Sequence, residues 1–154
     1  WERRAQQAEQ TGVRVCRLRI GLVIGRDGGF RKRMLLPFKL GLGGTLGDGQ
    51  QWMSWIHRDD LVQLILWLLS NDQYSGAYNG VAPNPVTNKE FTQTLEHCLH
   101  RPALLPAPAP MLKLALGEMS ALLLTGQKAY PKRALEGGFE FRFNHLQEAL
   151  SNVL

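Results

Sequence analysis

The hydrophobic and polar positions change their period along the chain, and each change marks an element. Residues 1–10 carry charged side chains around alanines, which suits a surface helix, and Thr11-Gly12 ends it. Val13 to Ile20 is rich in β-branched residues and predicts a strand, which Gly21 to Gly25 extends before a turn at Asp27-Gly28-Gly29. A helix that runs into such a strand is half of an α/β unit.

The stretch from Gly47 to Val62 predicts a turn, a strand and a capped helix in that order. A Gly-Asp-Gly turn leads into residues rich in Trp and Ile, which favours a strand. Within it Met53, Trp55 and His57 alternate, so one face of the strand would present all three. We expect the wall of any ligand pocket here.

Further helices are expected on both sides of a second strand. Asp59 or Asp60 can cap a helix over Leu61 to Leu69. Nearly every face of that helix is apolar, so we expect it to be buried on more than one side. Ala77 to Val81 predicts the strand, and a threonine cap with a capping-box glutamate then begins a helix over residues 88–100.

The remaining segments alternate between helical and extended patterns. Residues 30–40 are amphipathic, and residues 101–124 pass from a proline-punctuated stretch into a Met- and Leu-rich helical pattern. Pro131 opens a short helix. The alternating phenylalanines of residues 139–143 predict a half-buried strand, and Asn144 can open a final helix.

Composition excludes several classes of function. The chain has 154 residues, of which 44% are hydrophobic and 20% charged, and this is typical of one soluble globular domain. The net charge of +5 is spread thinly, and its one basic run, Arg31-Lys32-Arg33, is typical of a solvated helix face. We therefore expect no nucleic-acid partner, whereas an acidic small molecule fits. No apolar run reaches the roughly 18 residues that span a bilayer, so no membrane insertion is expected.

The two cysteines, Cys16 and Cys98, have no partners at the spacing of metal ligands. We interpret them as buried or inert thiols and predict no metal site. A disulfide-poor chain without a signal peptide favours a reducing, cytoplasmic setting.

Residues 41–49 are rich in glycine, and the bare backbone amides of such a loop can approach a phosphate. Dinucleotide-binding fingerprints lie between a strand and the N-terminus of a helix. This loop instead follows a predicted helix and leads into a predicted strand. We therefore interpret its glycines as turn residues.

Several segments in a fixed order carry a family resemblance: Met34 to Phe38, Leu40 to Gly44, Gly47 to Leu61, Tyr78-Asn79-Gly80, Ala82 to Asn88, Gly126-Gln127 before Pro131, and Gly138-Phe139 with Leu146 to Leu150. They resemble the C-terminal half of the extended short-chain dehydrogenase/reductase superfamily, which contains the NAD(P)-dependent sugar epimerases and dehydratases. More narrowly, they resemble an epimerase-like group of uncharacterised bacterial proteins with a C-terminal extension. The resemblance covers essentially the whole chain.

The resemblance implies an α/β fold, the C-terminal part of a Rossmann-like parallel sheet with a smaller, mostly helical substrate-side lobe. Residues 1–30 and 59–86 would form the last strands and helices of the nucleotide-binding domain. Residues 31–58 and 87–154 would form the substrate-side lobe with its C-terminal extension. The complete protein would bind NAD or NADP and a small, sugar-like substrate.

Two sets of residues would contact these ligands. The turn after the first strand would lie beside the nicotinamide: Gly21, Leu22 and Val23. The strand that follows would line the substrate side: Met53, Trp55 and His57. Sugar-nucleotide enzymes of the superfamily usually have an arginine at the position of Met53 to hold the diphosphate, so the methionine favours an apolar or differently charged substrate. For Trp55 and His57 the alternative is packing within the strand, and for His57 a further alternative is a general base.

The resemblance also identifies what this sequence lacks. No Gly-x-x-Gly-x-x-Gly lies between a strand and a helix, and none of Tyr74, Tyr78 and Tyr130 has a lysine four residues later, as the Tyr-x-x-x-Lys acid/base pair requires. We therefore expect a fragment of an epimerase or oxidoreductase that is inactive alone and has no catalytic residues of its own. A non-catalytic NAD(P)-binding redox sensor or scaffold is the alternative. The edge of the strand Val13 to Ile20 would be open to pairing, which predicts either a contact in a homo-oligomer or a missing N-terminal half of the protein.

Overall fold

The computed structural model describes residues 2–26, 44–100 and 125–154. The predicted helices within residues 30–40 and 101–124 lie outside these ranges. The described ranges contain both helices and strands, and the fold is the mixed α/β class that the sequence predicts. None of the helices in these ranges is long and apolar enough to cross a membrane.

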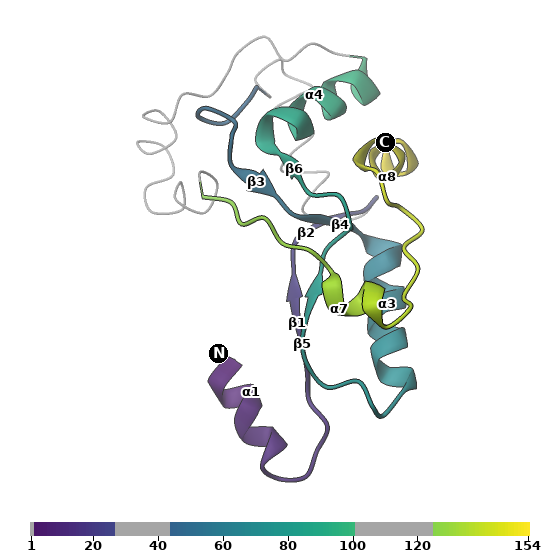
Figure 1. Cartoon of the computed structure of the whole chain (residues 1–154). Helices are drawn as coiled ribbons and strands as arrows, with labels where there is room; N and C mark the ends of the chain where they lie inside the picture. The colour runs from purple at the N-terminus through teal and green to yellow at the C-terminus, as the bar shows by residue number, and fades with distance from the viewer. Residues whose placement is uncertain (1, 27–43, 101–124) are drawn as a thin grey trace.

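The strands of the described ranges pair two by two into three small sheets. The pairs are β1 (Cys16–Ile20) with β5 (Gly76–Gly80) and β2 (Leu22–Ile24) with β4 (Trp55–His57), both parallel, and β3 (Trp52–Met53) with β6 (Val86–Thr87), antiparallel. Figure 1 shows β1 and β5 side by side, with α3 (Arg58–Ser70) and α7 (Lys132–Glu136) along one side of them. α1 (Glu2–Glu9) lies at one end of the molecule, and β3, β6 and α4 (Asn88–Leu99) gather at the other.

The first strand pairs in parallel with the strand near residue 80, in agreement with the Rossmann-like parallel sheet that the resemblance implies. Cys16 lies opposite Gly76 and Ile20 opposite Gly80, and α3 belongs to the connection between the two strands. A parallel pair needs such a crossover connection. The N-terminal half of the described chain is therefore built as a β-α-β arrangement.

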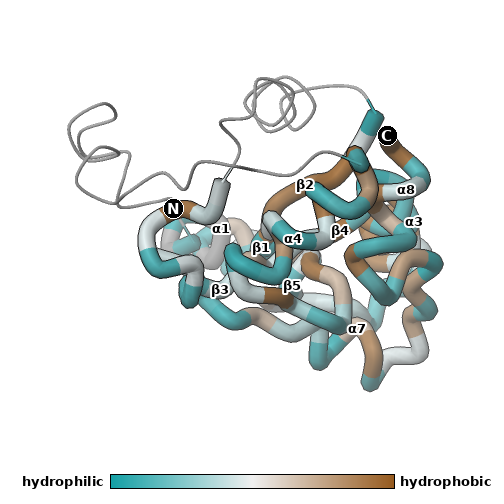
Figure 2. Tube along the Cα trace, turned by 90° about the horizontal axis from the view of Figure 1, so that it is seen from above, coloured by the Kyte–Doolittle hydropathy of each residue, from teal (hydrophilic) through white to brown (hydrophobic). Residues whose placement is uncertain are grey.

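The chain changes its strand partner at Gly21. The Gly21 N–H donates to the carbonyl of Gly80 (3.1 Å), whereas the next N–H, of Leu22, donates to the carbonyl of Ser54 (2.8 Å). The turn that the resemblance implies at Leu22 and Val23 is therefore wrong, and the strand extension that the residue pattern predicts is confirmed, because the apolar run from Leu22 to Ile24 continues as β2 along β4. Figure 2 shows β2 as a hydrophobic stretch of the tube, and Ile24 at its end is fully buried.

Helix α3 begins at a cap that the sequence does not reveal. The Nδ1 atom of His57, rather than Asp59 or Asp60, accepts the N–H of residue 59 (3.1 Å). The side chain of Asp60 is turned away into the interior, where it accepts the N–H groups of Arg142 (2.9 Å) and Phe143 (3.0 Å). Both carboxylates are thus in the first helical turn, but neither provides the N-terminal cap.

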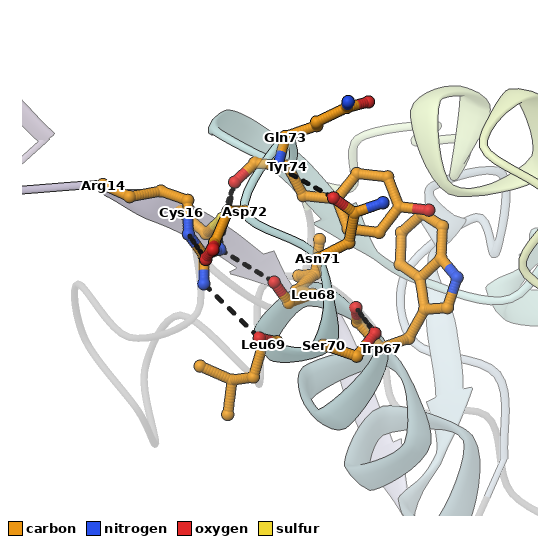
Figure 3. A network of polar contacts seen from close by, with 10 residues as sticks. All are labelled: Arg14, Cys16, Trp67, Leu68, Leu69, Ser70, Asn71, Asp72, Gln73 and Tyr74. Atoms are coloured by element: carbon orange, nitrogen blue, oxygen red, sulfur yellow. Dashed lines mark hydrogen bonds and ion pairs between the residues drawn. The ribbon is translucent and has the colours of Figure 1, made fainter.

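Arg14 closes the other end of α3 (Figure 3). Its guanidinium donates to the carbonyls of Leu68 (2.8 Å) and Leu69 (3.5 Å) in the last turn, and to that of Tyr74 (3.1 Å) in the loop beyond. The carbonyls at a helix C-terminus lack intrahelical partners and carry partial negative charge, so a cation is favourable there. The Cys16 thiol also donates to Tyr74 (3.1 Å), which gives it a structural contact.

The expectation that α3 is buried on more than one side is wrong for the described residues. Asp60, Leu64 and Leu68 are buried, but Leu66 and Leu69 keep 53% and 64% of their surfaces exposed. The buried residues follow the spacing of a single helix face. An apolar pattern on every face thus predicts that the segment is helical, but it does not predict how many faces of the helix are buried.

Two hydrophobic clusters form the interior. One joins β2 and β4 to α4 and α8 (Leu146–Val153): Ile24, Trp55, Ala82, Phe91, Leu95, Phe143, Leu146, Ala149, Leu150 and Val153. The other joins α3 to β5 and α7: Ile56, Leu64, Leu68, Tyr78, Ala134, Phe139 and Phe141.

The predicted capping box of α4 is confirmed, because Thr87 and Glu90 exchange hydrogen bonds at the start of the helix. Helix α8 begins after His145, without a side-chain cap, so the predicted opening by Asn144 is wrong.

Residues 139–143 cross between the two clusters without forming the predicted strand. The alternation of burial is present, since Phe139, Phe141 and Phe143 are buried and the residues between them are exposed. The N–H groups that a neighbouring strand would take are instead donated to Asp60. A carboxylate replaces a strand as the partner of this backbone.

Candidate functional site

A cleft of about 540 Å³ opens where β1 and β5 end. Its walls come from the β1–β2 junction, from β3, from the end of β5, from the start of α4 and from the segment that precedes α7. Ligands of open α/β sheets bind outside the carboxyl ends of parallel strands, and pockets of roughly 300–1,000 Å³ are typical of small-molecule sites. The position and size of the cleft thus favour a small-molecule site.

The structure divides the residues predicted to contact a nicotinamide. Gly21 and Leu22 line the cleft, whereas Val23 points into the hydrophobic cluster around α3. Gly21 is closely packed, because a Cβ atom there would collide with the carbonyl oxygen of Ser54. The Gly21 backbone is therefore packed directly against Ser54, and no residue with a side chain fits at this junction.

The residues predicted to line the substrate side are divided as well. Met53 lines the cleft, but Trp55 and His57 are 0% and 2% exposed and do not reach it. Their alternation is interrupted because the chain passes from β3 to β4 at Ser54, and each short strand has a different partner. The Trp55 indole N–H donates to the carbonyl of Asn84 (3.0 Å). Trp55 and His57 therefore pack in the interior, which is the alternative to a place on the substrate side.

Asn88 is a cleft residue that sequence reasoning missed. Its side chain is buried, its Oδ1 atom accepts the N–H of Leu46 (2.8 Å), and its Nδ2 atom donates to the sulfur of Met53 (3.2 Å). One amide thus fixes both a loop and the methionine that faces the cleft. The Pro-x-Thr-Asn sequence before α4 signals a helix start, which conceals this second role.

The segment before α7 covers one side of the cleft. The hydroxyl of Ser54 donates to the carbonyl of Gln127 (2.7 Å) and accepts the N–H of Ala129 (3.0 Å). Between these two residues, the ammonium group of Lys128 lies 3.9 Å from the ring centroid of Trp52, which is a cation–π contact. Ser54 therefore anchors an exposed segment that contains Lys128 beside Met53, the methionine that lines the cleft.

The cleft carries little charge in the described ranges. Arg19 is the single ionisable side chain among its described lining residues, and its guanidinium forms a fork with Glu2, with distances of 2.6 and 2.8 Å. The hydrogen bonds from Arg19 lower the pKa of the Glu2 carboxyl. Within residues 2–26, 44–100 and 125–154, no group of three or more His, Cys, Asp or Glu side chains is arranged to hold a metal ion. The walls can bind and orient a ligand, but the described residues that line them include no carboxylate or imidazole.

His57 is a buried, neutral imidazole. Burial lowers its pKa from the ordinary value of 6.5, an effect that the nearby carboxylates of Asp59 and Asp60 oppose. Its ring lies against Phe143 with 3.9 Å between centroids. Because Nδ1 accepts a backbone N–H, the proton of the neutral ring must be on Nε2.

The stability of the protein is expected to fall between pH 7 and pH 5 because of His57. The folded pKa is below the unfolded value, so in this window the unfolded chain binds more protons and the free energy of unfolding decreases as the pH is lowered. His57→Asn keeps a side chain suited to a helix cap but cannot titrate. Urea denaturation at both pH values should show a smaller fall for the variant. Parallel profiles for the two proteins would refute this role of His57.

Comparison with protein families identifies two matching regions. The NAD dependent epimerase/dehydratase family matches residues 2–79, just over half of the chain. Residues 107–153 match a second family, described as a domain of unknown function (DUF1731). The first region contains the β1–β2 junction and Met53, and the second contains the segment before α7 that covers the cleft.

Relatives extend the similarity over the whole chain. The Arabidopsis thaliana chloroplastic homolog of epimerase family protein SDR39U1 is 48% identical over 154 residues, which are 100% of this chain and 44% of that protein. The crystal structure of human epimerase family protein SDR39U1 (isoform 2) with NADPH superposes with a TM-score of 0.86 and 41% identity, over 92% of this chain and 48% of the human one. A nucleoside-diphosphate sugar epimerase from Corynebacterium glutamicum gives 0.73 and 29%, over 100% of this chain and 29% of its own. The chain thus spans less than half the length of each of these proteins.

Proposed function

Because the chain belongs to the NAD dependent epimerase/dehydratase family, we propose that it supplies the nicotinamide end and the substrate-side wall of an NAD(P)-dependent epimerase or oxidoreductase acting on a sugar-like molecule. The cleft at the ends of β1 and β5 is the observation that carries this proposal. The dinucleotide loop and the Tyr-x-x-x-Lys pair, which this sequence does not contain, would come from further residues of a longer protein. The chain alone would therefore be inactive.

The cofactor would lie against the β1–β2 junction. Gly21 and Leu22 line the cleft, so the backbone of the junction and the apolar side chain of Leu22 would contact a planar ring there. Val23 would act from behind by fixing β2 in the core. The human relative whose structure contains NADPH, at 41% identity, supports a nicotinamide cofactor. When bound, that group would supply or accept a hydride.

The substrate would contact Met53 and the basic segment around Lys128. A methionine offers no charged hydrogen bond to a diphosphate, and the sulfur of Met53 already accepts a hydrogen bond from the Asn88 side chain. The relative from Corynebacterium is a sugar-nucleotide epimerase, yet the apolar wall here favours a sugar-like molecule without a diphosphate at this position. Trp55 and His57 would act behind the wall, where they support Met53 through the strand.

A non-catalytic redox sensor is the second candidate. It is favoured by the absence of a carboxylate, imidazole or phenol among the described residues that line the cleft. A Tyr-x-x-x-Lys pair encoded upstream of Trp1 would favour the enzyme, and a nucleotide loop without that pair would favour the sensor. Both candidates predict NAD(P) binding.

The division of the chain into a nucleotide-binding part (residues 1–30 and 59–86) and a substrate-side part (31–58 and 87–154) belongs to this proposal. So does a partner for β1, which among the described residues is paired on one edge alone. Val13 and Ile20 keep 61% and 53% of their surfaces exposed, so this edge would take a strand of the longer protein or of a second copy. Sedimentation as a monomer of the complete protein at high concentration would exclude the second copy.

A ligand titration of the complete protein tests the proposal. We expect saturable binding of NADPH or NADH, followed by fluorescence, and no saturable binding of UDP in the millimolar range. Met53→Arg should raise the affinity for UDP at least tenfold, since a charge-assisted bond contributes roughly 1.5–3 kcal/mol. Met53→Leu, which keeps the wall apolar, is the matched control. Failure to bind either dinucleotide would refute the cofactor, and tight UDP binding by the wild type would refute the apolar substrate.

A further inference from the structure

A second, smaller recess lies between the start of α3 and the end of α8. It has a volume of about 220 Å³, and its lining residues are Arg26, His57, Arg58, Asp59, Asn152 and Val153. None of these residues lines the cleft described above. Figure 1 shows α8 near the N-terminal end of α3. The recess is therefore a separate feature of the fold.

The buried wall of this recess contains an unsatisfied donor. The Nε2 atom of His57 is inaccessible to solvent and has no hydrogen-bond partner. The opposite edge of the ring is engaged, because Nδ1 accepts the N–H of Asp59. The neutral ring must therefore carry its N–H at Nε2. The Asn152 side chain is close enough to raise the pKa of His57, but it does not complete a hydrogen bond to Nε2. A buried donor without a partner is unfavourable, so a ligand that accepts a hydrogen bond from Nε2 would be stabilised.

The charge of the recess favours an anion. Arg26 and Arg58 contribute two cations, and Asp59 contributes one carboxylate, whose oxygen lies 3.3 Å from Nε of Arg58. Arg26 uses its Nε to donate to the carbonyl of Asn152 (2.9 Å), so its guanidinium is fixed at the rim. The N-terminus of α3, a helix of 13 residues, adds partial positive charge.

We infer that this recess binds a small oxyanion, with the Nε2–H of His57 and the guanidinium of Arg26 as its principal donors. An oxygen of a phosphate or carboxylate accepts from both donor types, and charge-assisted bonds of this kind are short and strong. The volume accommodates the anionic group itself. Free inorganic phosphate and the phosphate group of a larger metabolite share this chemistry. The inference does not depend on the proposed function, because the two sites share no lining residue.

The test is a titration of the ¹⁵N-labelled protein with inorganic phosphate at constant ionic strength, maintained with sodium chloride. We expect saturable shifts of the backbone amides of Arg58, Asp59 and Asn152. Arg26→Gln should weaken phosphate binding at least tenfold, whereas Arg26→Lys, which keeps the charge, should weaken it less. Glucose 6-phosphate in a parallel titration distinguishes the sources, since stronger binding than that of phosphate indicates a larger metabolite.

Lys132→Gln is the control, because Lys132 is an exposed cation on α7 outside the recess. It should leave phosphate binding unchanged. Thermal denaturation of Arg26→Gln shows whether that variant is folded. Shifts that grow linearly without saturation, or equal binding by wild type and a folded Arg26→Gln, would overturn the inference. A spectrum that does not change when phosphate is added would also overturn the inference. If Asn152→Ala then shifts the signals of the His57 ring, the asparagine is the partner of Nε2.

Discussion

Asp60→Ala is expected to lower the free energy of unfolding by about 3 kcal/mol or more. The carboxylate accepts the N–H groups of Arg142 (2.9 Å) and Phe143 (3.0 Å), and each bond to a charged acceptor contributes roughly 1.5–3 kcal/mol. Alanine would leave two backbone donors without partners beside the core. Urea denaturation measures the loss directly. The melting temperature should fall by roughly 6–12 °C, at about 2–4 °C per kcal/mol for a chain of this size.

The neighbouring carboxylate provides a matched control. Asp59 is in the same helical turn, but its side chain is 43% exposed and its partner Arg58 is also at the surface. Exposed ion pairs contribute roughly 0–1 kcal/mol, so Asp59→Ala should cost little. Asp60→Asn retains one acceptor oxygen and should have an intermediate cost. A melting temperature of Asp60→Ala close to that of Asp59→Ala would show that the two N–H groups find other partners.

These carboxylates also show how far local sequence predicts the fold. The capping box of α4 depends on residues close in sequence and is as predicted, and β1 (Cys16–Ile20) forms over the second part of the predicted strand Val13 to Ile20. Asp59 and Asp60 both match the pattern of a helix cap, yet one lies at the surface and the other bonds a backbone more than 80 residues away. Nothing local to α3 distinguishes them. The failure of residues 139–143 to form a strand has the same cause, because their partner is a side chain distant in sequence.

The candidate site is partly predictable for a related reason. Gly21 lies between β1 and β2, Met53 is the last residue of β3, and the cleft forms at these strand ends. Trp55 and His57 share the period of Met53, but the strand changes partner at Ser54, which places them in the core. A period of two predicts a common face only while one strand continues. The role of Asn88 depends on two tertiary contacts, so no pattern in the sequence indicates it.

Gly21→Ala is expected to damage both stability and ligand binding, because this glycine is where two strand pairs meet. The added methyl group would overlap the Ser54 carbonyl oxygen, and Val81 Cγ1 would lie 2.9 Å away. Relief requires moving β2 away from the residue that accepts the Leu22 N–H (2.8 Å). Overpacking costs typically about 1–3 kcal/mol, and the weakened hydrogen bond adds about 1 kcal/mol. Urea denaturation should therefore show a loss of roughly 3 kcal/mol.

The same displacement would move the backbone that lines the cleft. In the complete protein we expect the affinity for NADPH to fall at least tenfold, which corresponds to about 1.4 kcal/mol. Gly80→Ala is the matched control, because its Cβ would approach the Leu18 side chain at 3.2 Å rather than a backbone atom, and a side chain can move. Gly80→Ala should therefore bind NADPH nearly as the wild type does. If Gly21→Ala loses stability but retains full NADPH affinity, the junction supports the fold without contacting the cofactor.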